Sequence, residues 1–269
     1  MVSFPHCKIN LGLHVLSKRS DGYHNIETCF YPVPRTDILE IISSKEFSFT
    51  SSGIKIDGDT DSNLCVKAFQ LLQQEFGIGE AKIHLHKIIP MGAGLGGGSA
   101  DAAYTLLLAN DIFNLQLTKT ELKNFAAQIG SDCAFFIEDQ PMIGSGRGEI
   151  LTPTSVSLKN YFLVLVKPNV HVSTADAYAG IIPKQTEKSI QEILKLPIQE
   201  WKEKLTNDFE ETIFKKHSII KEVKEKLYSL GAMHASMSGS GASVFGIFEN
   251  AVDLKNDFAG MDYWAGELK

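Results

Sequence analysis

The sequence predicts an α+β protein built from two domains. Segments in which apolar and polar residues alternate, as they do in strands, are interleaved with segments of helical spacing along all 269 residues. A stretch rich in glycine, serine, proline and threonine, residues 141–159, separates the two halves. We therefore expect an N-terminal domain of residues 1–152 and a C-terminal domain of residues 153–269, each with strands packed against helices.

Charge and composition exclude several classes of protein. The chain has 26 basic and 32 acidic residues and a formal net charge of −6, and glutamates interrupt its densest basic stretch, residues 221–226. Such a chain has no general attraction for nucleic acid. No apolar run approaches the roughly 18 residues of a membrane span, and residues 1–8 lack a secretory signal pattern. We expect a cytoplasmic protein with a small-molecule partner and no nucleic-acid or membrane partner; the sequence indicates no oligomeric state.

The four cysteines indicate reduced thiols. Cys7, Cys29, Cys65 and Cys133 lie far apart in the sequence, and no two of them form a C-x-x-C pair. Disulfide frameworks and zinc sites use closer and more regular spacings, so we expect reduced and mostly buried side chains.

Strands dominate the start of the first half. Residues 7–16 alternate apolar and polar side chains and end at the turn-forming residues 20–22. Residues 63–76 have apolar side chains at helical spacing, and the predicted helix stops at Gly77. Further strands are predicted at residues 26–33 and 37–43, near Phe47 and Ile54, and at residues 81–89.

A glycine-rich loop follows the last of these strands and precedes a helix. Five of the seven residues from Gly92 to Gly98 are glycine, and Ala102, Leu106 and Ala109 then lie along one helical face. Glycine lets the backbone curl so that consecutive N–H groups point at one anion, and the helix N-terminus adds partial positive charge. Because each glycine costs roughly 0.5–1 kcal/mol relative to alanine, a phosphate-binding loop is favoured over an ordinary turn.

The loop does not fit the commonest phosphate-binding patterns. No lysine follows the glycines, as the Walker pattern requires. The dinucleotide pattern G-x-G-x-x-G matches at Gly92, Gly94 and Gly97, but the chain then runs through two helices with no strand to carry the required acidic residue. Ser99 stands where the protein-kinase loop has valine, and no H-R-D motif occurs.

Helix and strand signals continue to the end of the chain. Thr118-x-x-Glu121 is a capping box that opens a helix, Gly130 closes this helix, and Ser131 and Asp132 follow directly. The second half begins with a buried strand at residues 161–166. It continues with helical segments around Ile190, Trp201 and Ile219, then strand at residues 234–248 with a small-residue loop at 238–242, and a last strand at 262–266.

Three segments, in this order, resemble the GHMP kinases, a family that includes homoserine and mevalonate kinases. They are residues 7–13 (CKINLGL), 90–100 (PMGAGLGGGSA) and 237–245 (MSGSGASVF). Other segments resemble the members whose alcohol substrate is a cytidyl diphosphate ester of methylerythritol. These are residues 19–24 (RSDGYH), the triple glycine before Ser99, and residues 129–132 (IGSD), 167–174 (KPNVHVST) and 207–210 (NDFE). The resemblance runs nearly end to end and is weakest between residues 180 and 205.

The resemblance implies both a fold and a reaction. The fold has an N-terminal domain similar to a small ribosomal protein, with a left-handed βαβ crossover, and a ferredoxin-like α+β C-terminal domain. The reaction is the ATP-dependent phosphorylation of the 2-hydroxyl of the cytidyl ester, giving the 2-phosphate and ADP, in the non-mevalonate route to isoprenoid precursors. A kinase of the homoserine or mevalonate type is the alternative within the family, and a catalytically silent nucleotide-binding module is the alternative outside it.

Lys8 and Asp132 are the expected catalytic residues. From the residues alone, Asp132 is equally well an ordinary N-cap, and Lys8 equally well extends from its strand to solvent. The resemblance implies instead that Asp132 accepts the proton of the alcohol and that Lys8 lies near it. A nearby ammonium keeps a carboxylate ionised and stabilises the transferring phosphoryl oxygens. Asn10, one pleat further along the same strand face, is expected to hydrogen-bond the acceptor.

ATP with Mg²⁺ is the expected co-substrate, with no tightly bound prosthetic group. No carboxylate cluster offers a protein cage for the metal, so Mg²⁺ is expected to arrive with ATP. Ser99 is expected to contact Mg²⁺ or a phosphate, or alternatively to cap its helix. The expected ATP-binding residues are Asn63, on the adenine side, and Pro90, Met91, Gly92, Ala93, Gly94, Leu95, Gly96, Gly97, Gly98, Ser99 and Ala100.

The cytosine ring is expected to stack on aromatic side chains, each contributing on the order of 1–3 kcal/mol. Tyr23 is expected to stack on the ring and His24 to contact the edge of the base. The resemblance implies that Tyr178 covers the opposite face. From the residues alone, Tyr23 packing within its hairpin and Tyr178 facing the core remain alternatives. The residues expected near the diphosphate or the erythritol are Thr174, Ser238 and Gly239.

Overall fold

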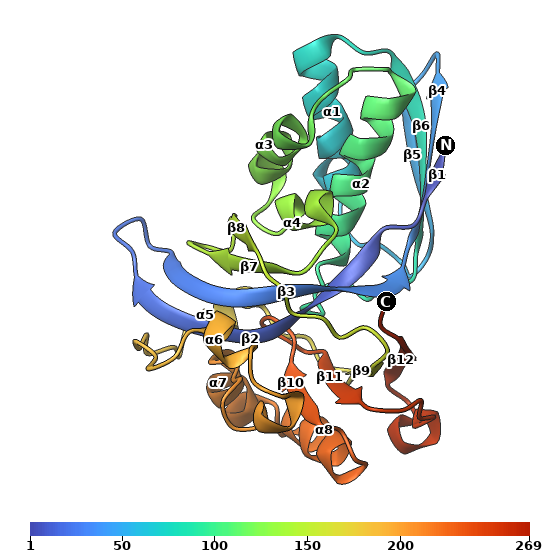
Figure 1. Cartoon of the computed structure of the whole chain (residues 1–269). Coiled ribbons are helices and arrows are strands. Elements are labelled where there is room, and N and C mark those ends of the chain that lie inside the picture. The colour runs from blue at the N-terminus through green and yellow to red at the C-terminus, as the bar shows by residue number, and fades with distance from the viewer. The chain divides into compact units, whose positions relative to one another are not determined.

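The computed structural model describes residues 1–269, and its elements are labelled in Figure 1. The chain forms two compact units, each of which collects segments that lie far apart in the sequence. The division predicted between residues 152 and 153 stays a prediction. None of the helices is long and apolar enough to cross a membrane. Unit 1 comprises Met1–Cys7, Arg35–Met91 and Gly96–Gln140, and unit 2 comprises Lys8–Pro34, Gly92–Leu95 and Pro141–Lys269.

Unit 1 has a four-stranded sheet in the order β1-β4-β6-β5. β1 and β6 each pair antiparallel with β4, whereas β5 and β6 are parallel neighbours. The connection between these parallel strands runs through a helix, α1, which makes β5, α1 and β6 a βαβ unit. The strands are β1 (Val2–Ser3), β4 (Ile38–Ser44), β5 (Ser48–Gly53) and β6 (Glu80–Lys87).

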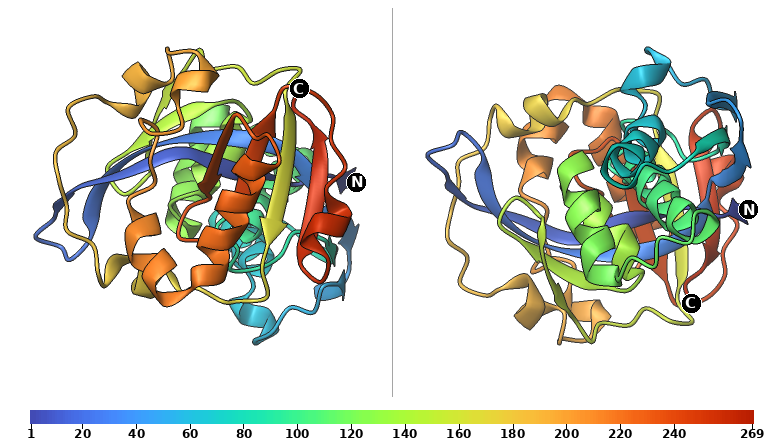
Figure 2. Two further views of the ribbon diagram at one scale, coloured as in Figure 1. Left: turned by 90° about the horizontal axis from the view of Figure 1, so that it is seen from below. Right: turned by 90° about the horizontal axis from the view of Figure 1, so that it is seen from above.

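Helices complete unit 1. α2 packs against α1, α3 and α4, and the right view of Figure 2 shows α1 and α2 side by side. Phe69 and Leu72 of α1 and Leu106 of α2 are fully buried. The helices are η1 (Thr60–Ser62), α1 (Leu64–Phe76), α2 (Gly97–Ile112), α3 (Lys119–Ile129) and α4 (Cys133–Glu138).

The helix ends of unit 1 confirm the sequence signals. The Asn63 side chain accepts a hydrogen bond from the backbone of Cys65 at the start of α1, and Gly77 ends this helix in the left-handed conformation. At the start of α3, both hydrogen bonds of the capping box between Thr118 and Glu121 are present. Local signals alone are therefore enough to locate these helices.

Unit 2 contains two four-stranded sheets, in the orders β2-β3-β7-β8 and β10-β11-β9-β12. The second sheet is antiparallel throughout, and β7 of the first pairs antiparallel with both β3 and β8. The strands of the first sheet are β2 (His6–Lys18), β3 (His24–Thr36), β7 (Met142–Ser145) and β8 (Ile150–Pro153). Those of the second are β9 (Phe162–Lys167), β10 (His234–Met237), β11 (Val244–Phe248) and β12 (Asp262–Glu267).

The longest helix of unit 2 packs on its second sheet. The left view of Figure 2 shows α8 lying across β10 and β11. Val223 of α8 and Phe209 of α7 share one apolar core with Val164 of β9 and with Leu13 and Val15 of β2. The helices are α5 (Thr174–Tyr178), α6 (Ile190–Ile193), η2 (Ile198–Glu200), α7 (Phe209–Lys216), α8 (Ser218–Ser229) and η3 (Lys255–Phe258).

The structure decides two further predictions. The helical segment predicted around Trp201 is wrong, because only the short η2 turn precedes this residue and α7 begins at Phe209. Pro197 restricts the backbone at the start of the turn, and the Trp201 indole donates a hydrogen bond to the carbonyl of Leu196 at 3.0 Å, which holds the chain in compact turns. The prediction of reduced thiols is confirmed, since all four cysteines are free and buried.

Candidate active site

The part of the glycine loop in unit 1 forms the start of α2. Gly96, the N-cap of α2, has a φ of 70° and no side chain to bond the first N–H groups of the helix. A Cβ on Gly97 would lie 2.9 Å from Ile89 Cγ2 and 3.0 Å from Lys87 Nζ, so only glycine lets α2 begin this close to the end of β6. The uncapped amides and the helix N-terminus together suit an anionic phosphate group.

The part of the loop in unit 2 is fixed around Gly94. Its carbonyl accepts hydrogen bonds from Lys8 Nζ and Ser238 Oγ, each at 2.9 Å. Gly94 has a φ of 75°, and a Cβ there would overlap the carbonyl oxygen of Ser238. The backbone of Lys8 also donates to the carbonyl of Leu95 at 2.9 Å. The glycine loop, β2 and the loop after β10 therefore meet at one residue.

Lys8 and Asn10 form one buried hydrogen-bonded chain on β2. Lys8 Nζ donates to Asn10 Oδ1 at 2.6 Å, and Asn10 Nδ2 donates to Thr28 Oγ1 at 2.9 Å. Thr28 in turn donates to the carbonyl of Gly12 at 2.6 Å. Both ends of the Asn10 amide are thus engaged, which fixes its orientation beside Lys8.

The loop that carries Ser238 and Gly239 is supported by the N-D-F-E segment of the sequence. Asn207 Nδ2 donates to the carbonyls of Met237 and Gly239, both at 2.8 Å. Glu210 Oε1 accepts hydrogen bonds from Ser236 Oγ at 3.0 Å and from the backbone of Met237 at 2.8 Å. The sequence reasoning noted this segment only as a resemblance, and its contacts show that it shapes the loop.

Asp132 lies at the N-cap position of α4 in unit 1, but its side chain makes no capping hydrogen bond to the helix. The next residue, Cys133, is hydrogen-bonded to the Ser99 side chain, which brings the first turn of α2 beside the start of α4. Burial raises the pKa of the Cys133 thiol to about 12, and the Ser99 hydrogen bond opposes this shift. The alternative that Ser99 is the N-cap of α2 is wrong, because Gly96 holds that position.

Asn63, the expected adenine-side residue, also lies near the glycine segment of unit 1. Its neighbour Leu64 places Cδ1 3.7 Å from where a Cβ on Gly98 would stand. The starts of α1 and α2 therefore meet, with Asn63 capping the first of them. Unit 1 thus groups Asn63, the residues from Gly96 to Ala100, and Asp132.

The aromatic residues of unit 2 contact one another or a neighbouring cation. The rings of His24 and Tyr178 are stacked, with centroids 4.9 Å apart and planes at 20°, and Phe209 meets Tyr178 edge-on at 4.8 Å. Burial and the charge of Lys18 lower the pKa of His24. Tyr23 does not share this stack: its side chain is 56% exposed, and the guanidinium of Arg147 lies 4.9 Å from its ring centre.

Two further residues of unit 2 lie next to the predicted site. Thr174 Oγ1 is 3.4 Å from Ser240 Oγ, so α5 reaches the loop that carries Ser238. His171, which the sequence reasoning did not single out, lies over the glycine loop, since a Cβ on Gly92 would be 3.1 Å from its Cε1. Its position in the KPNVHVST segment is the sequence signal that could have identified it.

A buried ion cluster that no sequence motif indicates lies under α2 in unit 1. Lys87 Nζ lies 2.5 Å from Asp37 Oδ2 and 2.7 Å from Asp101 Oδ2. Asp37 Oδ1 accepts hydrogen bonds from the backbone of Ile88 at 2.6 Å and Ile89 at 2.8 Å. Burial and the charge of Asp37 raise the pKa of Asp101 to about 7, against the opposing effect of Lys87. The cluster fixes the end of β6 against the helix that follows the glycine loop.

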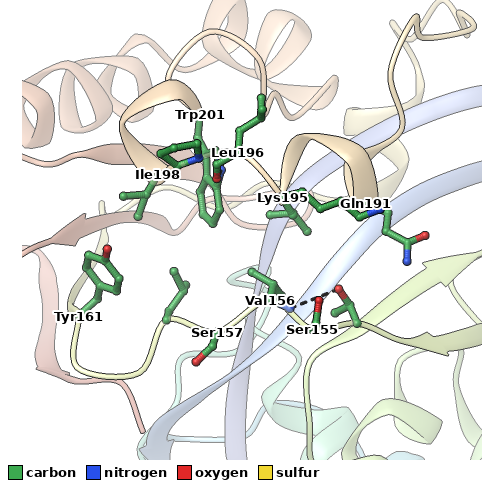
Figure 3. Close-up of a pocket in the computed structure, with 13 residues that line it drawn as sticks. Ser155, Val156, Ser157, Tyr161, Gln191, Lys195, Leu196, Ile198 and Trp201 are labelled. Carbon is green, nitrogen blue, oxygen red and sulfur yellow. Dashed lines mark hydrogen bonds between the residues drawn. The ribbon is translucent and has the colours of Figure 1, made fainter.

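A cavity of about 520 Å³ lies in another part of unit 2 (Figure 3). Ile198 and Trp201 project from one wall toward Val156 and Ser157 on the other. None of the predicted site residues lines this cavity.

Comparisons with known proteins agree on one family. Residues 63–146 match the model of the GHMP kinases N terminal domain, and residues 189–262 match that of the GHMP kinases C terminal domain. A 4-diphosphocytidyl-2-C-methyl-D-erythritol kinase of Parabacteroides distasonis is 49% identical over the whole of both chains. Proteins of the same name are 50% identical over the whole of both chains in Bacteroides fragilis and 52% identical over 92% of each chain in Cytophaga hutchinsonii.

Solved structures show the same fold. A crystal structure of 4-(cytidine 5′-diphospho)-2C-methyl-D-erythritol kinase superimposes with a TM-score of 0.85 and 30% identity, over 100% of this chain and 99% of that one. A homoserine kinase of Cytophaga hutchinsonii superimposes with a TM-score of 0.64 at 18% identity, over 98% of this chain and 95% of that one. The second likeness shows the fold alone.

Proposed function

Because the chain belongs to the 4-diphosphocytidyl-2-C-methyl-D-erythritol kinase family of the GHMP kinases, we propose that it phosphorylates that alcohol. In the proposed reaction, the γ-phosphoryl group of ATP moves to the 2-hydroxyl of 4-diphosphocytidyl-2-C-methyl-D-erythritol, giving the 2-phosphate and ADP. The single observation that supports this best is the near-full-length identity of about 50% to kinases of that name. We place the reaction in the cytoplasm, on the isoprenoid precursor route that the resemblance implies.

ATP is the co-substrate of this family, and the glycine loop suits its phosphates. The uncapped amides at Gly96 and Gly97 offer hydrogen bonds to phosphate oxygens; Gly96 has a φ of 70°, and the backbone position of Gly97 leaves no room for a side chain. Asn63 would contact the adenosine end, since α1 and α2 begin side by side. Mg²⁺ would bind together with the phosphates and neutralise their charge, with Ser99 the nearest hydroxyl on α2.

Two residues carry the proposed chemistry. Asp132 accepts the proton of the alcohol, the role that the family resemblance gives to the carboxylate at the start of α4. Lys8 supplies positive charge to the transferring phosphoryl oxygens, and Asn10 hydrogen-bonds the acceptor. The contacts of Lys8 with Asn10 and Gly94 hold its ammonium in one position before substrate binds.

Tyr23, His24 and Tyr178 are proposed to bind the cytosine. A centroid distance of 4.9 Å is a direct ring contact, so no base fits between His24 and Tyr178 as they stand. We infer that the base takes the place of His24 on the Tyr178 ring, while His24 turns its ring nitrogens toward the edge of the base. Thr174, Ser238 and Gly239 would then face the diphosphate or the erythritol, as their position beside the glycine loop supports.

The test is turnover of competing alcohols. In a coupled assay of ADP release, we expect turnover of the cytidyl substrate and little with homoserine or mevalonate; comparable turnover of homoserine would contradict the proposal. Asp132→Asn is expected to lower kcat by at least about 100-fold, the usual scale for loss of a general base, with ATP affinity nearly unchanged. Asp111→Asn makes the same change at an exposed position of α2 and should leave kcat intact.

A further inference from the structure

His6, the first residue of β2, contacts two helices of unit 1. Its Nε2 lies 2.8 Å from Oδ1 of Asp139, at the end of α4, and its Nδ1 lies 2.8 Å from the carbonyl oxygen of Cys7. Its ring packs against Phe136 of α4 at 5.4 Å and against Tyr104 of α2 at 6.0 Å, measured between ring centres. The residue is 8% exposed, so these contacts are made inside the protein.

α4 depends on such contacts because it is short. A helix of six residues is marginal by itself, and its orientation must come from tertiary packing. At its first residue it is tied to α2 through Cys133 and Ser99. Near its last residue, Glu138 pairs with Lys119 and Lys123 of α3, at 3.1 and 2.5 Å. His6 adds a contact at the C-terminal end of α4.

Asp139 is suited to this tie by its backbone. It ends α4 with a φ of 54°, a left-handed conformation that asparagine, aspartate and glycine adopt most readily. From there its carboxylate reaches back to the His6 ring. Burial and the charge of Asp139 raise the pKa of Tyr104 to about 12.

Asp132 lies at the other end of the same helix. At a rise of 1.5 Å per residue, α4 separates Asp132 from Asp139 by only about 10 Å, so a shift at one end moves the other. His6 therefore contacts the end of α4 opposite to the end that carries the proposed catalytic carboxylate.

We propose that His6 is a positioning residue whose contact with Asp139, together with its ring packing, fixes α4 and thereby the orientation of the Asp132 carboxylate. The proposal rests on the catalytic role given to Asp132 under the proposed function. Displacement of a reacting group by about 1 Å lowers rates by up to about 100-fold, so a modest rotation of α4 is enough to matter.

The test separates the ring packing of His6 from its contact with Asp139. His6→Phe keeps a ring against Phe136 and Tyr104 but loses the contact with Asp139, whereas His6→Gln keeps a donor near the position of Nε2. Asp139→Gly keeps the left-handed backbone and removes the carboxylate. We expect His6→Phe and Asp139→Gly each to lower kcat about tenfold with both KM values within about twofold, the double variant to be no worse than either, and His6→Gln to recover part of the loss.

A second readout does not depend on the reaction. Amide hydrogen exchange of residues 133–138 is expected to quicken in His6→Phe and Asp139→Gly, with α3 unchanged. His86→Phe, the same substitution on the face of β6, should change neither exchange nor kcat. Unchanged exchange, or additive losses of kcat in the double variant, would overturn the proposal. Absence of turnover by the unaltered protein would instead overturn the proposed function, and exchange would still decide the role of His6.

Discussion

Two groups of proposed substrate-binding residues in unit 2 are built in opposite ways. Around Gly94, a backbone carbonyl accepts hydrogen bonds from two buried side chains, and neighbouring loops approach so closely that no Cβ fits. At the other group, His24 rests on Tyr178, and Tyr23 lies under Arg147 with more than half of its side chain exposed. The first group is held by directional bonds, and the second by ring contacts between side chains.

The difference indicates how each group meets its ligand. A buried hydrogen bond to a charged donor contributes about 1.5–3 kcal/mol, so rearranging the Gly94 region is costly, and we expect it to have its final shape before the proposed binding of ATP. Aromatic pairs contribute about 0.5–1.5 kcal/mol beyond burial, and a base stacking on the same ring replaces that amount. We therefore expect the proposed phosphate region to be rigid and the proposed base-binding region to be adaptable.

The largest expected effect, on both stability and activity, comes from a substitution that disrupts the hydrogen-bonded region around Gly94. Gly94→Ala places a methyl group against the Ser238 carbonyl and forces an L-residue to a φ of 75°, so we expect loss of stability of about 3 kcal/mol or more and a fall in activity of at least about 100-fold. Urea unfolding and the ADP-release assay measure the two effects.

Gly77→Ala is the matched control for this prediction. Gly77 has a φ of 62° but nothing within 4 Å of its added Cβ, so only the backbone penalty of about 1 kcal/mol applies. If both variants lose the same stability, the close approach of the two loops at Gly94 does not occur in solution.

A smaller effect, on the KM for the cytidyl substrate, is expected from changes to the aromatic residues proposed to bind the base. Tyr178→Ala removes one stacking face, and at 1–3 kcal/mol per stacked base we expect KM for the cytidyl substrate to rise about tenfold with KM for ATP nearly unchanged. Tyr23→Ala should act in the same direction, because it removes the other face. Tyr161→Ala, a tyrosine of unit 2 remote from the stack in sequence, serves as control; equal changes in both KM values would argue against cytosine stacking.

Some of these structural features can be predicted from the sequence, and others cannot. A helix cap such as that formed by Thr118 and Glu121 depends on residues that are close together in the sequence, so the sequence alone predicts it. The same holds for the position of the glycine loop. The meeting of Gly94 with Ser238 joins positions 144 residues apart, and the ion cluster joins Asp37 to Lys87 across the sheet. No local pattern encodes such distant pairs, because they depend on how the strands and helices come together.

The resemblance predicts roles for residues of the loops, although local patterns do not predict how the loops pack. A resemblance transfers residue roles, which is how Lys8 and Asp132 were singled out, and these roles stay predictions. It gave no role to Asn207 or to His6, because their contacts are made with backbone or with residues outside the resembling segments. Supporting residues of this kind can be identified only when the structure shows which residues they contact.

The smallest expected effect at neutral pH concerns a third kind of environment, a buried core that binds no ligand. His234 is 1% exposed, packs against Trp201 and Phe245, and has no hydrogen-bond partner for either ring nitrogen. Burial lowers its pKa to about 3. The unfolded chain takes up a proton near pH 6.5, whereas the folded protein does so only near pH 3, so this residue reduces stability as the pH falls from 6.5.

His234→Phe removes the unpartnered nitrogens and the titration together. We expect the variant to be more stable than the unaltered protein by roughly 1 kcal/mol at pH 7, since an unsatisfied buried polar group costs about 1–3 kcal/mol and the larger ring offsets part of this. At pH 5 the difference should grow by about 2 kcal/mol, because 1.4 kcal/mol is lost per pH unit below 6.5. Urea unfolding at the two pH values measures both quantities, and a difference that stays constant with pH would show that His234 is protonated or hydrated in the folded protein. Such a result would mean that the surroundings of His234 rearrange to admit water or a proton. The second sheet of unit 2 would then be adaptable, as we expect of the contact between His24 and Tyr178.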